Sequence, residues 1–99
     1  MATLHVLSHS PFADSRLQSC LRLLGRADGL LLSGDAVYAL QPGSAPSDAL
    51  ASLPESVGLF ALSEDLEARA ITPPARVQGV DYPGFVELSC RFDKVNSWL

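Results

Sequence analysis

One cysteine lies where it could carry sulfur. The segment from Ser10 to Cys20, SPFADSRLQSC, leads from an apolar run through a proline turn into a helix-forming stretch. Arg16 precedes Cys20 by four residues, so a helix places both side chains on one face. A nearby cation favours the thiolate, which is the form that attacks the outer sulfur of a persulfide donor. This spacing makes Cys20 the candidate catalytic residue, with sulfur transfer as its chemistry.

The same cysteine also fits a packing role. Leu17, Leu21 and Leu24 form the apolar stripe of the predicted helix, and Cys20 would complete that stripe. Free thiols are among the most commonly buried groups in proteins. Local sequence therefore leaves two alternatives open, a sulfur carrier and a core residue. Cys90, between Leu88 and Phe92, is predicted to be core.

The other polar residues at predicted strand ends have structural explanations. A His, a Ser and an Asp follow these strands, but no serine has the GxSxG pattern that exposes a hydrolase nucleophile. Ser63 to Asp65 suits a helix start, Asp35 suits a turn, and His5 inside the first strand is predicted to pack. His9, in a loop, is predicted to be solvated. No GxGxxG, Walker, CxxC or zinc-spaced motif occurs, so we expect no cofactor and no metal.

Composition limits the class of protein. The 99 residues suit a single domain spanning 1–99, with 47% hydrophobic residues to form one core. A formal charge of -4 and seven scattered basic residues argue against direct nucleic-acid binding. The apolar runs are too short for a bilayer span, and the start MATLHVL does not read as a signal peptide, so we expect no membrane contact. The expected location is cytoplasmic, where cysteines stay reduced.

Strands and helices alternate along the chain. Strands are predicted at Thr3 to Leu7, Gly29 to Leu32, about Val57 to Leu62 and, more weakly, Val77 to Val80. Helices are expected from Ser15, as cap, to Gly25, after Ser63, again as cap, and after Asp81 and Pro83, with a short helical piece at AVYAL. The last of these helices is expected to present Phe85, Leu88 and Phe92 on one face. Gln41 to Pro54 is predicted to be a loop with one helical turn. This order predicts an α/β fold with a doubly wound, mainly parallel sheet.

So small a sheet is expected to need a partner. About three helices must cover two faces, which leaves apolar surface exposed and predicts an oligomer. Trp98 and Leu99 close the chain. They are expected to pack either on the chain's own core or on a neighbour.

Several segments together resemble the DsrH/TusB family of DsrE/DsrF/DsrH-like sulfur-relay proteins. They are LHVLSHSPF, SCLRLL, GLLLSGDAVYAL, LFALSEDLEARA, VDYPGFVEL and the closing SWL, in the same order over essentially the whole chain. The resemblance implies a small flavodoxin-like domain. It also implies a heterohexamer with TusC/DsrF-like and TusD/DsrE-like subunits.

The resemblance further implies a role in moving sulfur. In the Tus branch such a complex relays persulfide sulfur between TusA-like and TusE-like carriers, toward 2-thiouridine at the tRNA wobble position. In the Dsr branch a similar complex serves dissimilatory sulfur oxidation. The principal sulfur-accepting cysteine belongs to the DsrE/TusD-like subunit, so this chain is expected to be accessory, with Cys20 a secondary sulfur site and no independent activity. A cysteine in the first helix is common in DsrH-like members, whereas many TusB members lack it, so the branch stays open. We favour the Tus branch because tRNA thiolation is the more widespread pathway.

Two other classes of function compete with this interpretation. An independent thiol enzyme would need an anion-binding loop around its cysteine, and LQSCLRLLG is amphipathic helix instead. A noncatalytic flavodoxin-like binding module would need no sulfur chemistry.

Overall fold

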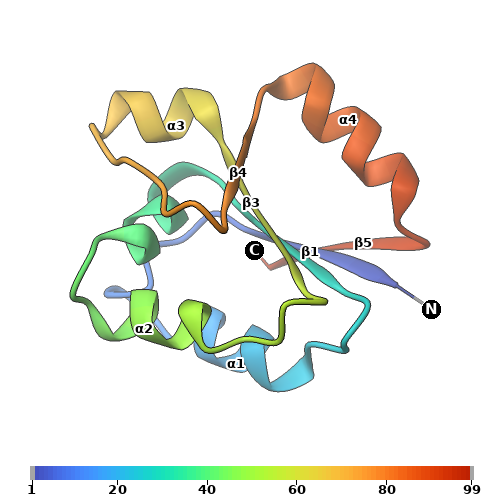
Figure 1. The fold of residues 1–99 in the computed structure, drawn as a ribbon, viewed down its shortest axis with the longest axis horizontal. Coiled ribbons are helices and arrows are strands. Elements are labelled where there is room, and N and C mark those ends of the chain that lie inside the picture. Colours follow the sequence, from blue (N-terminus) through green and yellow to red (C-terminus); the bar gives the residue numbers. More distant parts are fainter. Residues whose placement is uncertain (1, 99) are drawn as a thin grey trace.

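The chain folds into one five-stranded sheet with helices on both faces (Figure 1). A computed structural model describes residues 2–98. Its elements, in chain order, are β1 (Thr3–Leu7), α1 (Arg16–Leu23), β2 (Gly29–Leu32), the 3-10 helix η1 (Gly34–Leu40), α2 (Ala45–Ala51), β3 (Gly58–Leu62), α3 (Ser63–Ala68), β4 (Gln78–Val80), α4 (Tyr82–Arg91) and β5 (Lys94–Trp98). All strand pairs are parallel. The predicted α/β class with a doubly wound, parallel sheet is confirmed.

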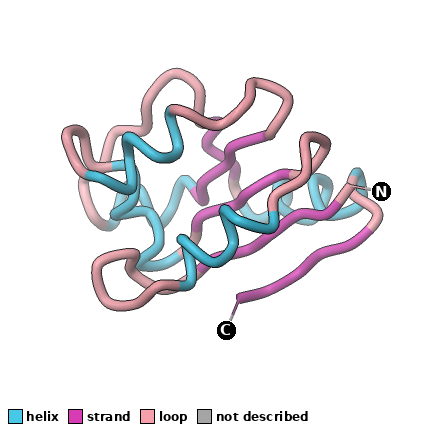
Figure 2. Tube along the Cα trace, turned by 90° about the horizontal axis from the view of Figure 1, so that it is seen from below, coloured by secondary structure: helices cyan, strands magenta, loops and turns pink. Residues whose placement is uncertain are grey.

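The strand order is β4-β3-β2-β1-β5. The chain steps outward from β1 to β4, and α4 then returns it across the sheet to β5 beside β1. A flavodoxin sheet has the strand order 2-1-3-4-5, in which the second strand is the edge strand beside the first. In this chain, β5 is the edge strand beside β1. Figure 2 shows β5 as the outer strand of the sheet, ending at the C-terminus.

Two apolar clusters sandwich the sheet. Leu30 and Leu32 of β2 point to the cluster that contains Leu17 and Cys20 of α1, whereas Leu31 points to the cluster under α4. This alternation explains why β2 is apolar throughout, since a strand buried on both faces needs hydrophobic residues at every position. Helix α4 packs on the second cluster through Phe85 and Leu88, together with Phe92 just after its last residue, as predicted from their spacing. The cluster's strand members are Leu4, Leu31, Phe60, Leu62 and Val80, with Val6 packed against them.

Some local predictions were wrong. Residues 45–51 form a seven-residue helix, longer than the one helical turn predicted there, because the Ser44 hydroxyl accepts a hydrogen bond from the Ser47 backbone N–H and a proline stands in the first turn. Ser15 and Ser63 make no side-chain cap bond. Asp81 does cap α4, accepting from Gly84 N at 2.8 Å. Cys90 is exposed and not part of the core.

The strand β5 was not predicted from sequence. Lys94 to Ser97 are all exposed. An edge strand that few helices cover can carry polar side chains, so its sequence shows no apolar pattern. Trp98 packs against the chain's own core and donates from Nε1 to His5 Nδ1 at 3.1 Å. Of the two alternatives for the chain's end, Trp98 takes the intramolecular one. Leu99 lies outside the described residues.

A buried carboxylate joins the beginning of the sheet to the end of α1. Asp28 accepts hydrogen bonds from Thr3 N at 2.9 Å, Gly25 N at 2.8 Å and His5 Nε2 at 3.3 Å. Burial alone would raise the pKa of Asp28, but the bonds from Gly25, Thr3 and His5 outweigh it and hold this pKa below its ordinary value. Asp28 therefore stays ionised in the folded protein near neutral pH.

Replacing Asp28 by Asn should weaken the fold. The amide keeps one acceptor oxygen but sets an NH₂ group against one of the three donors, so we expect a loss of about 1.5–3 kcal/mol in the free energy of unfolding at pH 7. The lowered pKa of Asp28 means that its stabilisation exists above the unfolded-state pKa of about 3.9 and is lost as pH falls through the folded-state value. The variant should therefore lose less stability than the wild type on acidification.

Urea unfolding followed by circular dichroism at several pH values measures both effects. Glu55→Gln is the matched control, because it removes an exposed carboxylate in a loop. Equal stability losses for the two variants would show that Asp28 is not a structural anchor.

Candidate functional site

A cavity lies where parallel α/β sheets usually bind ligands, beyond the carboxyl ends of the strands. Its volume is about 400 Å³, and it lies on the α4 side of the sheet. Val6, Leu31 and Leu62 come from the ends of β1, β2 and β3, and helix α4 adds Tyr82 and Phe85 to the lining. The full lining is Val6, Leu31, Ser33, Gly34, Leu62, Asp65, Tyr82 and Phe85. The walls are mainly apolar, with one carboxylate and one phenol.

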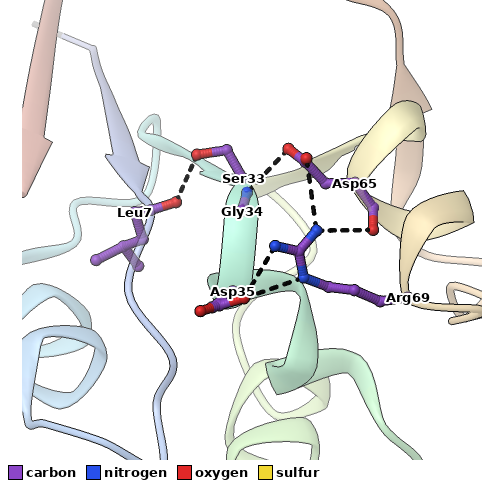
Figure 3. Close-up of polar contacts among 6 residues, drawn as sticks. All are labelled: Leu7, Ser33, Gly34, Asp35, Asp65 and Arg69. Atoms are coloured by element: carbon purple, nitrogen blue, oxygen red, sulfur yellow. Dashed lines mark hydrogen bonds and ion pairs between the residues drawn. The ribbon is translucent and has the colours of Figure 1, made fainter.

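The polar groups beside this cavity bond to one another (Figure 3). The Ser33 hydroxyl donates to the Leu7 carbonyl oxygen at 3.0 Å, and the Gly34 N–H donates to Asp65 Oδ2 at 2.9 Å. Gly34 has φ +51°, and a Cβ there would lie 3.2 Å from the Ser8 carbonyl oxygen, so a side chain is disfavoured at this turn. The turn after β2 is thereby fixed to both β1 and α3.

Arg69 holds the outer side of the same turn. Its Nη2 donates to Asp35 Oδ1 at 2.9 Å, its Nη1 lies 3.6 Å from Asp65 Oδ1, and its guanidinium lies 5.8 Å from the centre of the Tyr38 ring. The hydrogen bond that Arg69 donates to Asp35 raises the pKa of Arg69, which keeps it charged. Both carboxylates are thus paired with a cation. From sequence, Asp35 was interpreted as a turn residue and Asp65 as part of a helix start. That both pair with Arg69 was not predicted. The i,i+4 spacing of Asp65 and Arg69 is the signal that identifies half of this network.

The cavity lacks the groups needed for nucleophilic catalysis. No cysteine or histidine is among its lining residues, and the Ser33 hydroxyl already donates to a backbone carbonyl. A serine nucleophile needs an adjacent base to take its proton. The arrangement is suited to holding a small apolar group and not to reacting with it.

The structure places Cys20 away from this cavity. Its side chain is 0% exposed and belongs to the cluster under α1, on the opposite face of the sheet. Burial, and in second place the charge of Asp28, raise the pKa of the Cys20 thiol to about 12. In the folded chain Cys20 is therefore a protonated thiol that no other protein can reach.

The expected activating cation has another partner. Arg16 forms an ion pair with Asp14, and its backbone N–H donates to Asp14 Oδ1 at 3.0 Å. These contacts, the backbone bond first, lower the pKa of Asp14. The prediction that Arg16 favours a Cys20 thiolate is wrong, because a carboxylate two residues away competes for the guanidinium and burial keeps the thiol neutral.

The other titratable residues considered from sequence do not form a site together. His9 is exposed and lies 3.4 Å from the Ser8 hydroxyl through Nδ1, and Cys90 is exposed on α4. Within residues 2–98, no group of three or more His, Cys, Asp or Glu side chains is arranged to hold a metal ion. Over the same residues, no helix has the length and apolarity required to cross a bilayer.

Comparison with known proteins places these features in a family. Residues 9–95 match the family described as DsrH like protein. Protein TusB of Erwinia tasmaniensis is 42% identical, with 96% of this chain and 99% of that protein covered. Protein TusB of Serratia proteamaculans is 38% identical and that of Enterobacter sp. (strain 638) is 34% identical, each over the same shares of the two chains.

A solved structure shares the fold. The crystal structure of the ychN protein from E. coli superposes with a TM-score of 0.81 at 20% identity, covering 99% of this chain and 100% of that one. Together with the match to the family over residues 9–95, the full-length similarity to three TusB proteins leads to one conclusion: this chain belongs to the DsrH family.

Proposed function

We propose that this chain is an accessory subunit of a persulfide sulfur-relay complex, in which a sister subunit carries the main sulfur-accepting cysteine. Membership of the DsrH family and the TusB relatives support the relay. The accessory role rests on one observation. The only cysteine on the helix expected to carry sulfur is 0% exposed, with a pKa near 12, so it lacks both the access and the thiolate that persulfide transfer requires.

The proposed partners are TusC/DsrF-like and TusD/DsrE-like subunits, and through them TusA-like and TusE-like carriers. Exposed apolar side chains support association, among them Tyr82 and Val86 on α4 and Val95 on β5. Such residues on a small sheet protein are natural contacts for another subunit. We further propose that the complex acts in the cytoplasm on 2-thiouridine formation at the tRNA wobble position, because the similar proteins are named TusB; the alternative is sulfur oxidation of the Dsr type.

Co-expression with the two sister subunits tests the assembly. With an affinity tag on this chain only, we expect both sisters to co-purify and to elute together with it in size exclusion, because the exposed apolar surface is buried in the complex. Omitting one sister at a time is the control. Free chain with no sister bound, when all three are soluble, would contradict the proposed function.

Sulfur loading of that complex tests the division of labour. In a complex whose copy of this chain carries Cys90→Ser, which removes the exposed thiol, intact-mass analysis of each subunit after incubation with a persulfide donor should find added sulfur on the TusD/DsrE-like subunit and none on this chain. The role of Cys20 as a secondary sulfur site stays a prediction, and burial makes it depend on α1 first moving off the sheet. Added sulfur that disappears with Cys20→Ala would establish that role and refute the purely accessory one.

The two cysteines should differ sharply in reactivity. In the native chain, an aromatic disulfide reagent should modify Cys90 rapidly and Cys20 only after denaturation, since Cys90 is exposed and Cys20 is buried. Cys90→Ser isolates the slow thiol, and Cys20→Ala, expected to cost about 1 kcal/mol of stability, isolates the fast one. Rapid native modification of Cys90→Ser protein would mean that Cys20 is accessible after all.

A further inference from the structure

The hydrogen bonds of His5 define its protonation state. The indole Nε1–H of Trp98 can only donate, so His5 Nδ1, at 3.1 Å, must accept and carries no proton. His5 Nε2 lies 3.3 Å from Asp28 Oδ2, and a carboxylate can only accept, so Nε2 carries the proton. This chain of three side chains therefore requires neutral His5 in one tautomer.

The surroundings of His5 leave it few alternatives. It is 5% exposed, and its neighbour in the register of β5 is Asn96. The ionisable side chains of the neighbouring elements are Asp28 just before β2, Arg16, Cys20 and Arg22 of α1, and Asp93 and Lys94 at the start of β5. Among them, Asp28 contacts the His5 ring, at 3.3 Å. Strand β2, on the other side of β1, brings no charged group. Asp28 is thus the counter-charge available to a protonated His5.

We propose that His5 is a proton-operated latch for the C-terminal strand: neutral His5 holds Trp98, and protonated His5 releases it. A proton on His5 Nδ1 places two N–H donors, this one and the indole Nε1–H of Trp98, face to face, so the hydrogen bond between the two rings is lost. The same proton turns the contact between Nε2 and Asp28 into an ion pair, so the imidazolium keeps Asp28 and gives up the indole.

The position of Trp98 makes such a release local. Trp98 ends a strand at the edge of the sheet, with β1 as its one neighbouring strand. Its side chain packs against the cluster that contains Leu7, its partner in the register. Without the bond to His5, the end of β5 can detach while β2, β3 and α4 keep their places. The apolar side chains beside Leu7, which Trp98 covers, then become exposed to solvent.

The test uses the chain of 99 residues, in which Trp98 is the single tryptophan and His5 and His9 are the two histidines. In ¹⁵N-labelled protein, the signals of the His5 ring and of the Trp98 indole N–H should change together over a pH series that runs from neutral to acidic. Loss of a bond worth about 1 kcal/mol should raise indole hydrogen exchange roughly fivefold at the acidic end, after correction for intrinsic exchange. Far-UV circular dichroism should stay constant over that range.

Two variants separate the latch from general acid effects. His5→Gln offers an acceptor and a donor without a titrating group, so its indole signal should not change with pH. His9→Gln, the matched exposed control, should behave as the wild type. An indole signal that is unchanged while the His5 ring is protonated, ring and indole signals that change at different pH values, or the same transition in His5→Gln would each overturn the proposal. If His5→Gln does not fold, the joint titration in the wild type decides alone.

Discussion

The hydrogen bonds to the buried carboxylate of Asp28 are the interaction on which the rest of the structure depends. A buried charge is costly unless it is fully hydrogen bonded, and Asp28 has two backbone N–H groups and an imidazole as donors. These donors belong to the first strand and to the turn after α1. His5 extends the same network to Trp98, which is 93 positions away in the sequence. One side chain thus fixes where β1 begins, how α1 enters β2, and where β5 ends.

The fold was largely predictable from sequence because the hydrophobic pattern of each inner element reflects which of its faces are buried. GLLL is apolar at every position because β2 is buried on both faces, and Phe85, Leu88 and Phe92 repeat at helical spacing because α4 has one buried face. The edge strand β5 escaped prediction for the opposite reason. KVNSW is exposed along most of its length, so neither alternation nor an apolar run marks it. Its place is decided by long-range pairing with β1 and by the bond from Trp98 to His5.

The candidate site was harder to predict because local spacing does not determine how a helix is rotated. Arg16 and Cys20 do lie one turn apart, but the face that α1 buries is the one with Leu17 and Cys20. A thiol on that face packs in the core and stays protonated. Asp28, which raises the pKa of Cys20 further, stands in the sequence RADG, where an aspartate reads as a turn residue. Only the tertiary structure brings it beside α1 and β1.

The buried thiol of Cys20 and the cavity at the strand ends lie on opposite faces of the sheet. The cavity at the strand ends has apolar walls and no thiol, and the cluster around Cys20 has a thiol and no opening. A change of one residue cannot unite them, because β1 and β2 stand between. Meanwhile α4 alone covers its face and leaves Val86 62% exposed. A chain built in this way offers surface for contacts more readily than a reacting sulfur, which supports the proposal that the sulfur chemistry lies on another subunit.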